Sequence, residues 1–171
     1  IFDCLVGSEM CIRDSALTVG ELSQMAIQEG WLTSNPPNLT IVKMDGWERK
    51  MFYDDTNLPW VPPSPNIPDL ETAIIYPGMC LYEATNVSEG RGTNNPFKQI
   101  GAPWMTYEIA KEMKDLSFEG IDFEYAKFKP KNLPGKAEKP KFENKNCFGQ
   151  KFVITDQNTF RSVEVAIQSI Y

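Results

Sequence analysis

The residues of this chain that could do chemistry gather in one stretch, CLYEATNVSEGRGTNNPFKQIGAPW, which runs from Cys80 to Trp104. It holds two carboxylates, Glu83 and Glu89, near the guanidinium of Arg91, together with several amide and hydroxyl side chains. Such a dense set of charged and amide groups can hydrogen-bond a polar ligand from several directions. Glycine and proline interrupt every regular period here, so the stretch is expected to be a loop. Loops on a rigid scaffold commonly carry function, and we therefore expect the functional site here.

The chain contains no histidine, which excludes several kinds of catalysis. Ser-His-Asp and Cys-His mechanisms and histidine-ligated zinc are not available within these residues. Proton transfer must then use carboxylates, lysine, tyrosine or water. We therefore expect carboxylate chemistry, with no cofactor and no metal.

The composition is that of one globular domain without a basic surface. With 171 residues and 42% hydrophobic content, the chain can bury one core and a small satellite. Its net charge of -6 disfavours nucleic acid and anionic membrane surfaces, because both attract basic proteins. No apolar run approaches the ~20 residues that cross a bilayer. We expect neither a nucleic-acid partner nor a transmembrane segment.

Local patterns in the first half predict two helices and one strand. Thr18 and Glu21 have the spacing of a capping box, which marks the start of a helix. Asp69 is a good cap for a second helix, which Pro77 and Gly78 are expected to stop. The predicted elements are a helix over 19–29, a strand over 39–44 and a helix over 70–76.

The second half alternates between helix and strand patterns. From Ile121 onward apolar and polar residues alternate and predict a half-buried strand, with Phe123 and Tyr125 on one face and Ala126 and Phe128 on the other. The fold class is therefore α+β or α/β, a mixed sheet packed with helices, with a long Gly/Pro-rich functional loop. The predicted elements are a helix over 106–116, a strand over 121–130, a solvated connection over 129–146, a strand over 148–156 and a helix from Asp156 or Thr159 to Tyr171.

Both ends of the chain are expected to be artificial. Residues 3–15 resemble, almost letter for letter, the peptide encoded by a translated sequencing adapter, so 1–15 are set aside as a tag would be. A native edge strand over 2–6 is the alternative. The last helix reaches Tyr171 without a cap, so we expect a truncation there. Cys80 and Cys147 are either a disulfide or two buried thiols.

Four long segments of rare composition carry a family resemblance: TVGEL from Thr18, GWERKMFYDDTNLPW from Gly46, PSPNIPDLETAIIYPGMCLYEATNVSEGRGT from Pro63 and PFKQIGAPW from Pro96. They resemble the exo-β-N-acetylmuramidase (NamZ) family. The resemblance implies that 16–171 is the C-terminal domain, truncated at its end, of a protein whose N-terminal Rossmann-like α/β domain is missing. It also implies an active site in the cleft between the two domains, which releases terminal N-acetylmuramic acid from peptidoglycan fragments.

The same resemblance implies a periplasmic or secreted location and an enzyme that needs both domains. The family's catalytic acid is expected in the missing domain, so the fragment alone is expected to be inactive. Glu83 is our candidate for the catalytic carboxylate contributed by this chain, because glycoside hydrolysis usually uses two. Its alternative role is to hold Arg91 and the loop amides in place.

Five residues are expected to bind the saccharide. Arg91 is the candidate for the lactyl carboxylate of muramic acid, because a guanidinium presents a fork of donors to a carboxylate. The alternative is that Arg91 pairs with Glu83 or Glu89 and holds the loop. The flanking glycines of Arg91 are expected to let the backbone approach a ligand. Asn and Thr in such loops also commonly bond their own backbone. The other binding candidates are Asn86, Thr93, Asn66 and Glu89.

Three classes of function remain open at this point. The first is the cleft-forming half of a peptidoglycan glycoside hydrolase. The second is a stand-alone carbohydrate-binding module for cell-wall sugars. The third is a structural or interaction domain whose central loop only packs against a neighbour.

Overall fold

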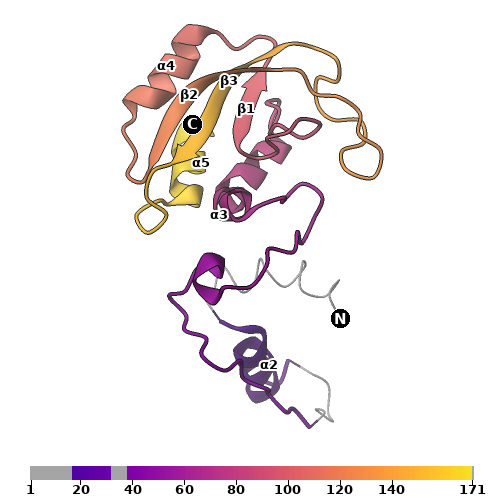
Figure 1. Cartoon of the computed structure of the whole chain (residues 1–171), viewed down its shortest axis with the longest axis vertical. Coiled ribbons are helices and arrows are strands. Elements are labelled where there is room, and N and C mark those ends of the chain that lie inside the picture. Colours follow the sequence, from indigo (N-terminus) through magenta and orange to yellow (C-terminus); the bar gives the residue numbers. More distant parts are fainter. Residues whose placement is uncertain (1–16, 32–37, 171) are drawn as a thin grey trace. The chain divides into compact units, whose positions relative to one another are not determined.

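The computed structural model describes residues 17–31 and 38–170, which fall into two compact units, Ile1–Phe52 and Tyr53–Tyr171 (Figure 1). The predicted adapter-derived segment 1–15 and the final residue Tyr171 lie outside the described residues. Within the described residues, no helix is long and apolar enough to span a bilayer.

The smaller unit contains the predicted N-terminal helix, α2, over Val19–Gln28. Its capping box is present, because Thr18 Oγ1 accepts a hydrogen bond from the Glu21 amide and Glu21 Oε2 accepts one from the Thr18 amide. Arg49 adds an ion pair to Glu21 at 2.7 Å. The Thr18 amide first, and then Arg49, lower the pKa of Glu21 to about 2. The strand predicted over 39–44 is wrong: these residues are irregular, and a strand without a neighbouring strand leaves its backbone groups unpaired.

The larger unit is built on a three-stranded antiparallel sheet of order β1-β3-β2. The α+β class is confirmed, but the sheet is antiparallel throughout where a mixed sheet was expected. The strand β1 lies inside the stretch predicted to be entirely loop, and it forms because its backbone pairs with β3. Gly101 of β1 faces Gly149 of β3 across that pairing. The strands are β1 (Gln99–Ala102), β2 (Ile121–Phe128) and β3 (Cys147–Ile154).

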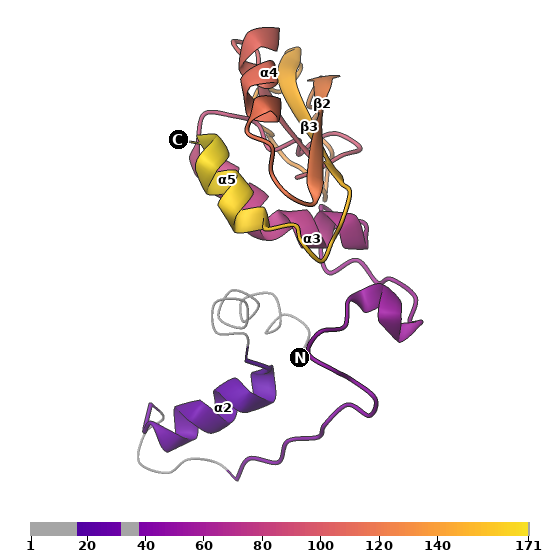
Figure 2. The ribbon, with the colours of Figure 1, turned by 90° about the vertical axis from the view of Figure 1, so that its left-hand side faces the viewer.

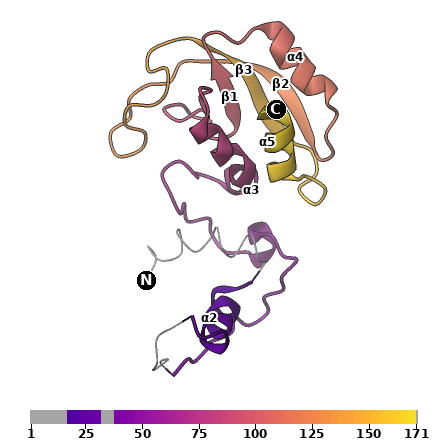
Figure 3. The same ribbon diagram turned by 180° about the vertical axis from the view of Figure 1, so that it is seen from behind.

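Helices pack against one face of this sheet. Figures 2 and 3 show α4 and α5 on the same side of the strands. The connection 129–146 is irregular, as predicted, and it extends past β1 (Figures 1 and 3). The last helix begins at Ser162, later than expected, because Asp156 closes a turn in which its carbonyl accepts from the Phe160 amide. The helices are α3 (Leu70–Met79), α4 (Tyr107–Asp115) and α5 (Ser162–Ile170), with 3₁₀ turns η1 (Tyr53–Thr56) and η2 (Cys80–Ala84).

The helix α3 begins at its predicted cap but does not end where expected. Asp69 accepts a hydrogen bond from the Thr72 amide at 2.8 Å. The helix then continues through Pro77 and Gly78, because α5 bonds backbone groups on either side of the proline. The Ser162 hydroxyl donates to the Ile75 carbonyl and accepts from the Gly78 amide. A tertiary contact therefore extends a helix that its own sequence would stop.

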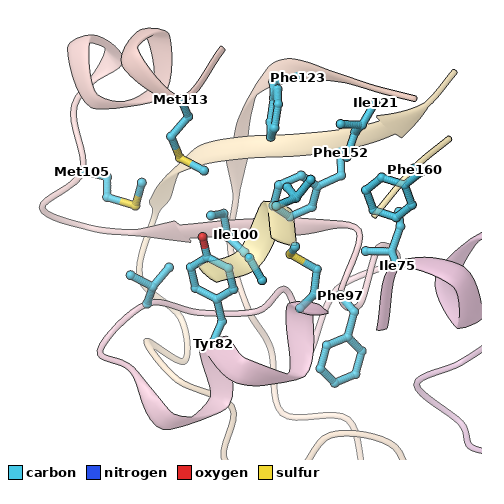
Figure 4. Close-up of a cluster of buried hydrophobic side chains, with 14 of the residues drawn as sticks. Ile75, Tyr82, Phe97, Ile100, Met105, Met113, Ile121, Phe123, Phe152 and Phe160 are labelled. Atoms are coloured by element: carbon cyan, nitrogen blue, oxygen red, sulfur yellow. The ribbon is translucent and has the colours of Figure 1, made fainter. Parts of the chain in front are cut away.

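The main core lies between the helices and the sheet (Figure 4). Phe152 is fully buried at the centre of β3, and its ring contacts Phe123 of β2 edge to face at 5.6 Å. The strand β2 changes its buried face along its length. Phe123 faces the main core, whereas Ala126 and Phe128 point to the opposite face and pack with Cys147 in a second small cluster.

The two cysteines of this unit are free thiols, so the disulfide alternative does not hold. Cys147 is fully buried, and burial raises its pKa to about 11. Burial likewise raises the pKa of the Tyr82 phenol to about 12, against the smaller lowering effect of its 2.6 Å hydrogen bond with Ser169. Both groups are therefore held in their neutral forms in the folded state.

These two raised pKa values predict alkaline destabilisation. A group whose pKa is higher in the folded state stabilises fully below its unfolded pKa, and that stabilisation is lost as pH rises through the folded pKa. The ordinary values are 9.0 for Cys147 and 10.0 for Tyr82, so the free energy of unfolding should fall between about pH 9 and pH 12. Urea unfolding at pH 8, 10 and 11.5 measures this. Tyr82→Phe should flatten the upper part of the decline, and an unchanged profile would contradict the assignment.

Candidate functional site

The stretch from Cys80 to Trp104 is ordered by backbone contacts with the rest of the unit. Ser88 and Gly101 exchange both backbone hydrogen bonds, at 2.8 and 2.9 Å, which fixes the loop to β1. Both Gly90 and Gly92 have φ of +79°, where a side chain is strained. A Cβ on Gly90 would lie 2.6 Å from the Asn95 carbonyl oxygen, and one on Gly92 would lie 2.5 Å from that of Lys131. These glycines let the chain approach itself, and their predicted role in letting the backbone approach a ligand stays a prediction.

The stretch from Cys80 to Trp104 and the distant segment 137–141 together line an open cavity of about 270 Å³. Two features make it the candidate site: it collects the charged residues predicted from the sequence, and it holds groups of both signs. Its lining residues are Glu83, Glu89, Arg91, Ala137, Glu138, Lys139, Pro140 and Lys141.

The predicted pairing of Arg91 with Glu83 is present in this cavity. Arg91 Nη1 lies 3.2 Å from Glu83 Oε1, and the two side chains are 38% and 41% exposed. An ion pair this exposed contributes only about 0–1 kcal/mol, because solvent screens it. The pair therefore orients the guanidinium but binds it only weakly. A ligand carboxylate can replace Glu83 on Arg91 with little loss of free energy.

Glu89 pairs with a lysine and not with Arg91. Its side chain is only 5% exposed, so it is buried and not solvated. Lys141 Nζ lies 3.2 Å from Glu89 Oε2 and donates hydrogen bonds to the carbonyls of Tyr82 and Val87, at 2.7 and 3.0 Å. The lysine neutralises Glu89 through charge, since Oε2 has no hydrogen-bond partner of good geometry among the described residues.

Lys141 is the important residue that the sequence analysis missed. It lies in a connection rich in lysine and proline, which was interpreted as solvated. No local pattern distinguishes it from the neighbouring exposed lysines, because its partners lie more than fifty residues earlier in the chain. The burial of Glu89 is the signal that points to Lys141, because a buried carboxylate needs a cation beside it.

Three predicted binding residues do not line the cavity. The Thr93 hydroxyl donates to the Gly90 carbonyl and accepts from the Asn95 amide and the Gln99 side chain, so its role here is to hold the loop. Asn66 is buried and donates to the Lys136 carbonyl at 2.6 Å. Asn86 is exposed on the loop. The structure thus brings together Glu83, Glu89 and Arg91 and leaves Asn66, Asn86 and Thr93 outside.

The cavity offers chemistry suited to an anionic, hydroxylated ligand. It presents one accessible guanidinium, one accessible carboxylate next to it and a second carboxylate whose charge is balanced by a lysine. Glu138 and Lys139 add further exposed charges at its rim. The described residues contain no group of three or more acidic or cysteine side chains placed to hold a metal ion.

Comparison with known proteins gives matches over most of the chain. The family model described as "Exo-beta-N-acetylmuramidase NamZ, C-terminal" matches residues 74–171. The model described as "Exo-beta-N-acetylmuramidase NamZ, N-terminal" matches residues 2–71. The second match therefore includes the stretch 16–71, which the sequence analysis placed in the C-terminal domain.

Individual relatives agree with this family. The Peptidoglycan beta-N-acetylmuramidase NamZ of Bacillus subtilis (strain 168) is 39% identical over 155 residues, which are 90% of this chain and 35% of that protein. Two crystal structures of DUF1343 family proteins from Bacteroides fragilis NCTC 9343 also match over 90% of this chain. One is 34% identical with a TM-score of 0.75 over 38% of its length, and the other is 31% identical with a TM-score of 0.59 over 36%.

The chain spans a little over a third of the length of these relatives. Its C-terminal match alone covers more than half of the residues, and it contains the whole cavity of Glu83, Glu89 and Arg91. The chain belongs to the exo-beta-N-acetylmuramidase NamZ family.

Proposed function

We propose that the larger unit is the cleft-forming part of a peptidoglycan glycoside hydrolase that releases terminal N-acetylmuramic acid. The observation that carries the proposal is the half-exposed guanidinium of Arg91, oriented in a cavity by a weak pair with Glu83. The name of the Bacillus subtilis relative, a peptidoglycan beta-N-acetylmuramidase, supports the substrate class. Muramic acid differs from glucosamine by a lactyl ether whose carboxylate suits this guanidinium.

Substrate binding exchanges one carboxylate for another at Arg91. The lactyl carboxylate takes the place of Glu83 on the guanidinium fork and forms a pair of charge-assisted hydrogen bonds. Glu83 is thereby released within the cavity, close to the bound sugar. Lys141 balances the charge of the buried Glu89. Glu89 therefore does not repel an anionic ligand bound at Arg91.

The remaining parts of the machinery belong to a second domain. Hydrolysis of a glycosidic bond usually needs two carboxyl groups about 5–9 Å apart on either side of the bond. We propose that Glu83 supplies one carboxyl group and an N-terminal Rossmann-like domain supplies the other. This chain alone is then expected to bind the saccharide but not to hydrolyse it. A periplasmic or secreted location follows from the substrate.

Arg91→Ala tests the lactyl recognition in a complete protein that contains this chain. We expect kcat/KM for a muramic acid glycoside to fall about a hundredfold, which corresponds to about 3 kcal/mol for a charge-assisted contact from which the bound sugar and the second domain exclude water. Turnover of the matched N-acetylglucosamine glycoside should not change, because that sugar lacks the carboxylate. Arg161→Ala is the control, since Arg161 lies outside the cavity. An equal loss on both sugars, or no loss on either, would contradict the proposal.

Glu83→Gln separates catalysis from binding at the same site. The amide keeps the size of the side chain but cannot take part in proton transfer or nucleophilic attack. If Glu83 is the catalytic carboxylate, the variant binds N-acetylmuramic acid and turns over at least a hundredfold more slowly. Unchanged turnover would remove Glu83 from the catalytic step. If neither Arg91→Ala nor Glu83→Gln alters turnover by the complete protein, but Arg91→Ala weakens sugar binding, the larger unit is a carbohydrate-binding module.

A further inference from the structure

A second cavity of about 290 Å³ lies on the helix-covered face of the sheet, between α4 and β2. Two of its lining residues are aromatic and exposed to solvent, Tyr107 at 61% and Tyr125 at 48%. Their ring centroids are 5.6 Å apart and their planes are inclined by 59°. It shares no lining residue with the cavity of Arg91. The lining residues are Tyr107, Lys111, Lys114, Phe123, Glu124, Tyr125 and Gln150.

The strand register extends this aromatic surface along the sheet. Tyr125 is paired with Gln150, and the next pair on the same strands is two residues further on the same face, Lys127 with Phe148. Lys127 Nζ lies over the Phe148 ring, 5.5 Å from its centroid. Figures 1 and 2 show α4 beside β2, covering only part of this face. The rings are therefore presented to solvent on rigid elements and not on a loop.

Exposed tyrosines of this kind need an explanation, because they leave apolar ring area in water. Two inclined rings form a shallow V into which a flat ligand with an apolar face can pack, while the phenol groups remain available for hydrogen bonds. A pyranose ring has this character, since its C–H face is apolar and its edge carries hydroxyls. Tyrosine also makes such contacts at a low entropic cost, because it has few rotatable bonds.

The charges around the rings select among ligands. Lys111 and Lys114 line the cavity beside the tyrosines, together with Glu124, in a chain whose net charge is -6. Lys114 pairs with Asp122 at 3.3 Å, and the nearby Glu124 is paired with Lys151 at 3.3 Å. An aromatic pair alone would also suit an organic cation, but these lysines repel one. A ligand with a carboxylate is favoured instead.

We propose that this surface, named here the Tyr107–Tyr125 surface, is a second saccharide site that binds a carboxylate-bearing sugar. One pyranose ring packs against the exposed faces of the two tyrosines, which touch each other. Its carboxylate is held by Lys111, and Lys114 is shared between that carboxylate and Asp122. The assignment does not depend on the role of Arg91, because it stands on other residues and on another cavity.

A titration of this chain by amide NMR tests the assignment. The probe is the disaccharide of N-acetylglucosamine and N-acetylmuramic acid, and the neutral comparison is N,N′-diacetylchitobiose. We expect shifts in α4 and β2, with the acidic disaccharide binding at least threefold more tightly. Tyr125→Ala should weaken binding at this surface about tenfold, and Lys111→Gln about threefold.

Two control variants separate this site from the other features of the chain. Arg91→Ala, in the first cavity, and Lys145→Gln, an exposed lysine elsewhere, should leave the α4 and β2 shifts unchanged. The proposal is overturned if Tyr125→Ala binds as the parent does, if the neutral disaccharide binds equally well, or if the α4 and β2 shifts respond only when Arg91 is intact. It is also overturned if a proline-rich peptide, the other ligand that exposed tyrosines accept, gives the shifts and the disaccharide does not.

Discussion

Replacing Lys141 by methionine is expected to lower the free energy of unfolding by about 3 kcal/mol. Methionine keeps the length of the side chain but leaves the Glu89 carboxylate, which is 5% exposed, without a countercharge. Removing one partner of a buried ion pair costs roughly 3–5 kcal/mol, and the partial exposure of Lys141 places this case at the lower end. The carbonyls of Tyr82 and Val87 lose their donor as well. Urea unfolding followed by tryptophan fluorescence measures the change.

A double-mutant cycle with Glu89→Gln shows whether the two residues act as a pair. With the carboxylate removed, Lys141→Met should cost at least about 1.5 kcal/mol less than it does in the parent chain. Lys145→Met serves as the matched control, because this lysine lies in the same connection and is exposed, and it should change stability by less than about 0.5 kcal/mol. Strictly additive losses in the cycle would show that Lys141 acts through the two carbonyls alone.

Gly78→Ala should destabilise the larger unit by about 3 kcal/mol or more. An added Cβ would lie 1.9 Å from the Ser162 carbonyl oxygen and 2.7 Å from its hydroxyl, so α3 and α5 must separate. Separation exposes Ile75 and Val165, which are buried where the two helices and the sheet meet. Within an isolated helix, the same substitution is favourable by up to ~1 kcal/mol. A loss of stability can therefore come only from the contact between the helices.

The matched control for Gly78 is Gly20, the other glycine inside a described helix. A Cβ on Gly20 meets the Ile41 Cγ2 methyl at 2.8 Å, and not another backbone; Ile41 is 40% exposed, so its side chain has room to move aside. Gly20→Ala should therefore be neutral or slightly stabilising. The thermal midpoint of each variant, measured by circular dichroism, gives the comparison. A Gly78→Ala chain that melts at the temperature of the parent would contradict the close contact of α3 with α5.

The elements that sequence patterns could predict are those whose signals are local. The capping box of Thr18 and Glu21, the cap of Asp69 and the alternation of residues from Ile121 are each local signals of one element, and each element is present. The errors have distant causes. The strand β1 forms because β3 pairs with it, and α3 extends past Pro77 because Ser162 bonds its last turn. Neither partner is near in sequence.

The candidate site shows the same division. The pair of Glu83 and Arg91 spans eight residues and was open to prediction as one of two alternatives. The burial of Glu89 was not, because it depends on Lys141 reaching the loop from another segment. Gly90 is needed where the Asn95 carbonyl approaches it, a contact within the chain that the sequence did not reveal, and its predicted approach to a ligand stays a prediction.

The most direct measurement of the central claim is a crystal structure of the complete protein with N-acetylmuramic acid bound. We expect the sugar to occupy the cavity of Glu83, Glu89 and Arg91, with its lactyl carboxylate within hydrogen-bonding distance of the Arg91 guanidinium and Glu83 displaced from it. A sugar bound elsewhere, with the pair of Arg91 and Glu83 intact, would contradict the claim that this guanidinium recognises the substrate.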